Sequence, residues 1–221
     1  MGLGPARSTY HGALQARVTS GNRWNIMGDG TYYTLNLSTD SQLVSSSSLM
    51  EYQLDGALAA LSIVHLVVEP CPISPFLIYT ACFTGATCLL KSQQHLLALV
   101  PDRQTRSVIS AILNFKRTDI ITPEAVVMHE VASRALEVAL VEIDYFQEAR
   151  EDEPHQKLLL QLLSLTLLGH TDPWSHCRFQ AFSEGLRLKF LGVNQFLQQF
   201  VKPDEQTDPP IYDFQSLIDS I

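Results

Sequence analysis

The sequence SLMEYQLDGALAALSIVHLVVEPCPISPFLIYTACF, residues 48–83, decides the fold. Its first part predicts a long apolar helix, because Ser48 can cap the first turn and Glu51 follows at the capping-box spacing. Three prolines between residues 70 and 75 interrupt that helix. Ser74-Pro75 then has the cap-and-proline order that begins a second helix. We therefore expect two apolar helices joined by a proline-rich elbow.

The first of these helices is predicted to lie in a protein core. Large side chains share one stripe at helical spacing: Leu54, Leu58, Leu61 and His65. The apolar run is too short to span a bilayer and it contains Asp55, so we interpret it as a buried helix. A carboxylate in such a helix must pair, cap backbone groups or face solvent, and Arg23 is a candidate partner.

The bulk properties limit the classes of function. The 221 residues are 46% apolar and 17% charged, which is typical of a globular protein. The net charge of −8 argues against a nucleic-acid surface. Four cysteines and no secretory leader favour a reducing compartment, so we expect a cytoplasmic or nuclear protein with protein partners and no membrane or nucleic acid. Arginines before Asp29 would also fit a mitochondrial presequence.

The chain is predicted to have three parts. Residues 1–22 are small and polar and are expected to be a disordered lead-in; residues 23–201 form a helical domain; residues 202–221 form a linker and a last short helix over 211–221. Alternation on both sides of Gly28-Asp29-Gly30 predicts a β-hairpin in residues 24–37. The expected fold class is mainly α (α+β), with this short N-terminal hairpin.

Further helices follow from apolar periodicity. They are expected at residues 88–99, 103–115, 122–140, 158–168, from 173 onward, and at 193–201. Residues 158–168 are apolar nearly all round, which predicts a fully buried helix that stops at Gly169. In the helix after Asp172-Pro173, one stripe carries Phe179, Phe182 and Leu186. Residues 139–146 fit helix or strand, with helix favoured, and residues 148–153 are predicted to be an acidic bend ending at Pro154.

Motifs that carry chemistry are absent from the sequence. It has no glycine-rich phosphate loop, no G-x-S-x-G elbow and no C-x-x-C pair. His129-Glu130 begins like a zinc-protease motif, but Ser133 stands where the second histidine ligand belongs. Three potential metal ligands lie around one turn: His170, His176 and Cys177. Chance accounts for them better than a site, so we predict no catalytic, cofactor-binding or metal residues and no cofactor.

The order of several segments does suggest a family. WNIMGDGTYYTLNL (residues 24–37) is followed by YQLDGALAALSIVH (52–65) and PISPFLIY (72–79), and later by FQAFSEGL (179–186) and FLQQF (196–200). This succession resembles the N-lobe of HECT-type ubiquitin ligases, with its hairpin, long apolar helix, proline-containing segment and closing helices. The resemblance implies that Gly56 permits close helix packing and that Phe76, Tyr79, Phe182 and Phe200 are core residues. The family places a subdomain that docks a conjugating enzyme within residues 89–158, but this stretch of the sequence shows no clear match to it.

The chemistry of that family lies in a separate C-lobe, where a cysteine accepts ubiquitin as a thioester. No stretch after Phe200 is long enough to be that lobe. The four cysteines, Cys71, Cys82, Cys88 and Cys177, all lie outside the family's cysteine context and are interpreted as structural. The resemblance therefore implies a HECT-like module that is not catalytic by itself and that binds a protein, with a ubiquitin-conjugating enzyme as one candidate.

Two other classes of function stay open. One is a helical scaffold or adaptor unrelated to ubiquitin, which would expose an apolar face of a few hundred Å². The other is a small-molecule enzyme with dispersed site residues, for example Asp55, His65 and His129, which would need a closed pocket with converging polar groups.

Overall fold

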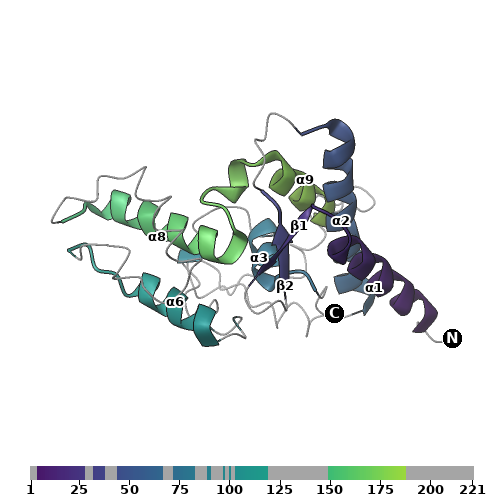
Figure 1. The fold of residues 1–221 in the computed structure, drawn as a ribbon, viewed down its shortest axis with the longest axis horizontal. Coiled ribbons are helices and arrows are strands. Elements are labelled where there is room, and N and C mark those ends of the chain that lie inside the picture. The colour runs from purple at the N-terminus through teal and green to yellow at the C-terminus, as the bar shows by residue number, and fades with distance from the viewer. Residues whose placement is uncertain are drawn as a thin grey trace, which may run out of the picture. The chain divides into compact units, whose positions relative to one another are not determined.

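The computed structural model describes residues 4–27, 32–37, 44–66, 72–82, 89–90, 97, 100, 103–118 and 149–187. These residues are mainly helical and include a two-stranded antiparallel hairpin near the N-terminus, so the predicted fold class is confirmed (Figure 1). The chain divides into two compact units. Unit 1 comprises residues 1–84 and 174–221, and unit 2 comprises residues 85–173. Two units thus stand where the sequence predicts one domain over residues 23–201.

The first helix of unit 1, α1 (Gly4–Thr19), lies where a disordered lead-in was expected, so that expectation is wrong for these residues. The helix packs on α2 (Ser46–Leu66), and its residues Leu14 and Val18 are both buried and lie four positions apart on one face. Most of its other side chains are small or polar. The apolar stripe of α1 is therefore too narrow to predict a helix from the sequence. Packing on α2 provides the stability that the intrinsic helix propensity of α1 does not.

The hairpin consists of β1 (Trp24–Met27) and β2 (Tyr32–Leu35), paired in the register Trp24 to Leu35, as the sequence predicts. Its second strand also pairs with the elbow that precedes α3 (Pro75–Cys82). The Tyr33 amide donates to the Pro72 carbonyl over 2.9 Å, and the Ser74 amide donates to the Tyr33 carbonyl over 2.8 Å. The hairpin is thus attached to the start of α3, all of whose residues are buried.

The start of α2 differs from the prediction by three residues. The helix begins at Ser46, and the Ser45 hydroxyl accepts a hydrogen bond of 3.3 Å from the Ser48 amide. Ser45, rather than Ser48, is therefore the N-cap, because an N-cap oxygen accepts from the third helical amide. Four consecutive serines offered several equivalent caps, and the sequence could not distinguish among them.

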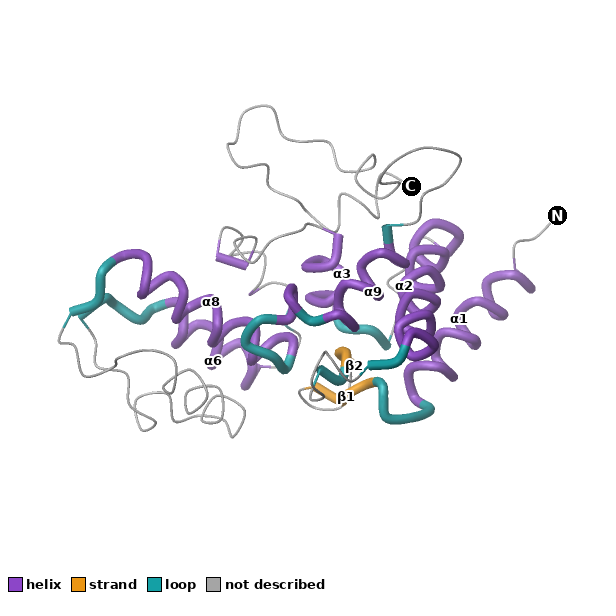
Figure 2. Tube along the Cα trace, turned by 90° about the horizontal axis from the view of Figure 1, so that it is seen from above, coloured by secondary structure: helices purple, strands orange, loops and turns teal. Residues whose placement is uncertain are grey.

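The last described helix of unit 1, α9 (Cys177–Leu186), follows the short helix η3 (Pro173–Ser175) and packs along α2. In both views α2 lies between α1 and α9 (Figures 1 and 2). The predicted stripe of Phe179, Phe182 and Leu186 is buried. The Trp24 ring meets Phe182 edge-on, with centroids 5.9 Å apart. The hairpin, α2 and α9 therefore share one core.

Two glycines allow α2 and α9 to pack with their backbones in contact. A Cβ added to Gly56 would lie 2.8 Å from the Leu186 nitrogen and would overlap the Phe182 carbonyl. A Cβ added to Gly185 would lie 2.7 Å from the Gln53 carbonyl carbon and would overlap its oxygen. Close packing at Gly56 is what the family resemblance implies for that position.

Unit 2 contains α6 (Arg103–Leu113) and α8 (Asp152–Leu168), which lie side by side. Val108, Ile109 and Ile112 bury one face of α6. The helix α8 begins at Asp152, so the bend predicted for residues 148–153 ends before Pro154. Asp152, Glu153 and Pro154 fit the first turn of a helix, which favours acids and tolerates proline. Gly169 ends α8 as predicted. Its φ is 73°, and its backbone amide donates a hydrogen bond of 3.0 Å to the Leu165 carbonyl.

Several predicted elements lie outside the described residues. These are most of the helix at 88–99, the helix at 122–140, the alternating stretch at 139–146, the helix at 193–201 with Phe200, and the segment 202–221. Among the helices that are described, none is long and apolar enough to cross a bilayer.

Candidate functional site

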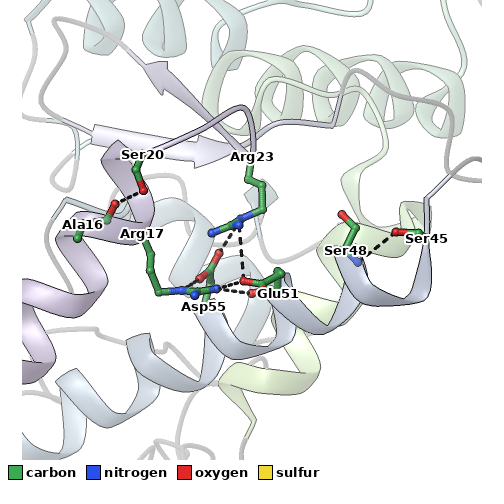
Figure 3. A network of polar contacts seen from close by, with 8 residues as sticks. All are labelled: Ala16, Arg17, Ser20, Arg23, Ser45, Ser48, Glu51 and Asp55. Carbon is green, nitrogen blue, oxygen red and sulfur yellow. Dashed lines mark hydrogen bonds and ion pairs between the residues drawn. The ribbon is translucent and has the colours of Figure 1, made fainter.

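Two arginines and two acids of unit 1 form a partly buried polar cluster, shown in Figure 3. Asp55 on α2 is completely buried. Its Oδ1 pairs with the Arg17 Nε, and its Oδ2 lies 3.4 Å from the Arg23 Nε. The predicted pairing of Asp55 with Arg23 is therefore confirmed, and Arg17 is a second partner that the sequence analysis missed.

Glu51, one turn before Asp55, completes this Arg–Asp cluster (Arg17, Arg23, Glu51 and Asp55). Its Oε2 lies 2.5 Å from the Arg17 Nη2 and 3.6 Å from the Arg23 Nη1. The hydrogen bond and charge of Arg17 lower the pKa of Glu51. Desolvation lowers the pKa of Arg17, but the hydrogen bonds and charges of Glu51 and Asp55 outweigh it and raise that pKa. Glu51 and Arg17 are therefore both ionised at neutral pH.

The local backbone explains how both arginines reach α2. At the end of α1 the Thr19 hydroxyl donates to the Gln15 carbonyl and the Ser20 hydroxyl to the Ala16 carbonyl. Gly21 follows with a φ of 111°, a conformation that favours glycine, and turns the chain back toward β1. Arg17 on the last turn of α1 and Arg23 just before β1 consequently face the same side of α2.

The chemistry of this cluster is that of a structural tie. A buried carboxylate between two guanidiniums is stabilised by their charges, and Asp55 has no surface exposed to a substrate. Of the three residues named for a dispersed enzyme site, Asp55 belongs to this cluster. The side chain of His65 and all of His129 lie outside the described residues.

A second polar contact joins α9 to α2 and to the end of β2. The Arg178 guanidinium lies 5.6 Å from the centroid of the Tyr52 ring, and its Nη1 donates to the Asn36 carbonyl over 2.6 Å. Burial raises the pKa of the Tyr52 hydroxyl. This contact also holds structural elements together.

The histidines considered as metal ligands act as local caps. The His170 Nδ1 accepts from the Asp172 amide over 3.1 Å, and the His176 Nδ1 accepts from the Arg178 amide over 3.2 Å at the start of α9. In the part of the chain that the structure describes, no three His, Cys, Asp or Glu side chains are grouped to hold a metal ion.

Among the described residues, neither Cys82 nor Cys177 forms a disulfide. Burial raises the pKa of the Cys82 thiol to about 12, so it is protonated at neutral pH. Cys177 is half-buried. Cys71 and Cys88 lie outside the described residues.

One long face of α2 is apolar and open. Met50 is 69% exposed and Leu54 is 46% exposed, while Ala57, Leu58 and Leu61 are half-buried. The sequence predicts the Leu54–Leu58–Leu61 stripe as the core side of this helix, but Leu54 is exposed and Leu58 and Leu61 are only half-buried. Because large apolar side chains lie on more than one side of α2, periodicity could not select the buried side. Gly56 selects it, since it admits α9, and the small residues Ala59 and Ala60 are buried with it.

Comparison with known proteins found no similar protein. The chain matches no family, and neither a curated protein nor a solved structure is significantly similar to it.

Proposed function

We propose that this chain is a HECT-like module of a ubiquitin-transfer system that is not catalytic by itself and docks a protein partner, with a conjugating enzyme as the expected partner class. The observation that carries the proposal is the close backbone packing of α2 on α9, in which Gly56 faces Phe182 and Leu186 and Gly185 faces Gln53 and Ala57. It joins the two segments, residues 52–65 and 179–186, that carry the resemblance to the N-lobe. The segments 24–37 and 72–79 lie against the same core through Trp24 and Tyr33.

The division of the chain supports the same proposal. Residues 85–173 form a compact unit inserted between α3 and α9. The resemblance expects a docking subdomain within residues 89–158, which is nearly the same part of the chain. We therefore expect the conjugating enzyme to contact unit 2.

The non-catalytic part of the proposal rests on the thiols. A thioester mechanism needs an accessible thiolate, and Cys82 is buried with a pKa of about 12. We expect the chain to bind a ubiquitin-loaded conjugating enzyme without accepting ubiquitin onto its own cysteines.

The test is a binding assay of the full chain against a panel of ubiquitin-loaded and unloaded conjugating enzymes, followed by hydrogen exchange of every complex found. Binding with added protection in residues 103–118 or 152–168 is expected. A double variant of the α2 face, M50E/L54E, should bind equally well because it changes only unit 1. The absence of binding to every member of the panel would contradict the ubiquitin part of the proposal.

A second candidate function is a helical scaffold or adaptor unrelated to ubiquitin. The open face of α2 favours it, because exposed apolar faces commonly mark interaction sites. Binding of an unrelated protein that M50E/L54E abolishes, with protection in residues 50–61, would support this candidate over the first.

A further inference from the structure

The two arginines of the Arg–Asp cluster come from different elements and share the same two acids (Figure 3). Arg17, on α1, pairs with the Oδ1 of Asp55, and its Nη2 lies 2.5 Å from the Oε2 of Glu51. Arg23, just before β1, lies 3.4 Å from the Oδ2 of Asp55 and 3.6 Å from the same Glu51 oxygen. Each acid therefore keeps one guanidinium beside it if the other arginine leaves.

The position of Arg23 allows it to hold the buried carboxylate without Arg17. Its two distances are longer than the roughly 2.7–2.9 Å of a charge-assisted hydrogen bond, so it can approach Asp55 more closely once Arg17 is gone. A buried carboxylate that lost both guanidiniums would be strongly destabilising. The second arginine removes this penalty from a movement of α1 alone.

Few buried residues hold the described part of α1 in place. Of residues 9–19, Leu14 and Val18 are buried, Tyr10 and Arg17 are half-buried, and the other seven are exposed. In α9, by contrast, six of the ten residues are buried. Segments with few buried apolar contacts open at a lower free energy than the core beside them. We therefore expect α1 to open more readily than α9.

The boundary between α1 and the hairpin lies at Gly21, whose φ is 111°. Residues 20–22 are exposed. Beyond this glycine, the side-chain amide of Asn36 donates to the Asn22 carbonyl, and the backbone amide of Asn36 donates to the Arg23 carbonyl, each over 2.8 Å. These bonds attach residues 22 and 23 to the hairpin. A rotation at Gly21 can therefore move α1 while Arg23 stays in place.

A movement of α1 would uncover one side of α2. Asp55, Ala59 and Ser62 occupy positions i, i+4 and i+7 of that helix, so they share the side on which Arg17 reaches Asp55. All three residues are buried. The position of α1 therefore determines whether this side of α2 is accessible.

We propose that α1 is a detachable strap, which opens as a unit at Gly21 while α2, α9 and the hairpin stay folded. In the open state Arg23 alone holds Asp55 and Glu51. The strap thereby controls access to the side of α2 that carries Asp55, Ala59 and Ser62. The inference does not depend on the ubiquitin proposal, because it uses only contacts within unit 1.

Hydrogen exchange of the full chain tests the proposal, at increasing denaturant and under conditions where the rate reports the opening equilibrium. In the wild-type chain, the amides of residues 9–19 should share one opening free energy, lower than that of α9. Their exchange should also depend less on denaturant, because opening the strap exposes less surface than unfolding unit 1.

Two variants separate opening of the strap from unfolding of the whole unit. G56A weakens the packing of α9 on α2, which the open and closed states both keep. It should therefore speed exchange in α9 about fivefold or more and leave residues 9–19 unchanged. L14A removes a contact that is lost both on opening and on unfolding, so it should speed exchange in the two segments by the same factor.

Loss of Arg23 should act on the two segments in opposite directions. In R23Q the closed state keeps Arg17 beside Asp55, whereas the open state would leave that buried carboxylate unpaired. Exchange in residues 9–19 should therefore slow several-fold, while exchange in α9 becomes faster. The matched variant R23K keeps a cation at this position and should retain the wild-type pattern.

Two outcomes would overturn the proposal. An equal acceleration of residues 9–19 and α9 in G56A would mean that α1 opens only when the whole of unit 1 unfolds. Faster exchange of residues 9–19 in R23Q would mean that Arg23 does not hold the open state. The G56A comparison decides the question by itself if R23Q does not fold.

Discussion

Arg17 and Asp55 lie 38 positions apart in the chain and form an ion pair in which the carboxylate is completely buried. The pair joins α1 to α2, although α1 lies within the residues that sequence composition assigns to a disordered lead-in. Arg23 contacts the other oxygen of the same carboxylate, so the start of the hairpin is attached at the same point.

Replacing Arg17 with glutamine should destabilise unit 1 by about 2–3 kcal/mol. Removing one partner of a buried pair leaves a charge insufficiently compensated, and Arg23 would retain part of the compensation. Chemical denaturation measures the free energy of unfolding. The control is D152N, which breaks the exposed pair between Arg117 Nη1 and Asp152 Oδ1 at 2.8 Å and should cost less than about 1 kcal/mol. Equal losses in the two variants would contradict the assignment of Arg17 as a buried tie.

The Glu51 carboxyl should report the same tie through its titration. Arg17 lowers the pKa of Glu51 in the folded protein, so the stability that this carboxylate contributes is present above its unfolded pKa of about 4.3. That contribution is lost as pH falls through the folded pKa. In R17Q the folded pKa should rise toward the ordinary value, as NMR titration would show. An unchanged titration would mean that Arg17 is not its partner in solution.

A second pH dependence is expected in unit 2 from His155. Burial lowers the pKa of this imidazole, the charge of Arg150 lowers it further, and the Arg150 Nε lies 3.4 Å from its Nδ1. The unfolded chain therefore binds the proton first as pH falls below about 6.5, and stability decreases from there until the folded pKa is reached.

H155Q should flatten that loss of stability between pH 7.5 and 5.5, because glutamine does not titrate. Denaturation at the two pH values measures it. The exposed residue His11, on α1, supplies the control variant H11Q, which should keep the wild-type dependence. A steeper dependence in H155Q would reverse the sign predicted here.

The Cys82 thiol should resist alkylation in the folded protein. With a pKa of about 12, its thiolate fraction at pH 8 is roughly a thousandfold below that of an ordinary cysteine. Iodoacetamide labelling followed by peptide mass spectrometry should therefore modify Cys82 rapidly only in denaturant, and the half-buried Cys177 provides the comparison within the same sample. Rapid native labelling of Cys82 would place that thiol at the surface.

Much of the fold could be predicted because its signals are local. The hairpin follows from alternation around Gly28-Asp29-Gly30, the start of α3 follows from Ser74-Pro75, and the end of α8 follows from Gly169. Each of these depends on backbone conformations that a few neighbouring residues determine.

The errors concern tertiary choices. The helix α1 depends on α2 for its stability, and only the spacing of Leu14 and Val18 indicates it in the sequence. The sequence pattern places the large side chains of α2 on its buried side. In the structure α9 packs closely on α2 at Gly56, so the side with small residues is buried. Of the Arg–Asp cluster, the sequence predicted the pairing of Asp55 with Arg23 but not that with Arg17, because Arg17 lies in the segment expected to be disordered.

The central claim is that α9 packs on α2 through glycine, and the free energy of unfolding of two alanine variants tests it most directly. G56A should be destabilised by about 1–3 kcal/mol, because the new methyl group would overlap the backbone of α9. G12A, at a helical position of α1 with no atom near the added Cβ, should gain about 0.5–1 kcal/mol. If G56A is as stable as G12A, the two helices do not pack this way.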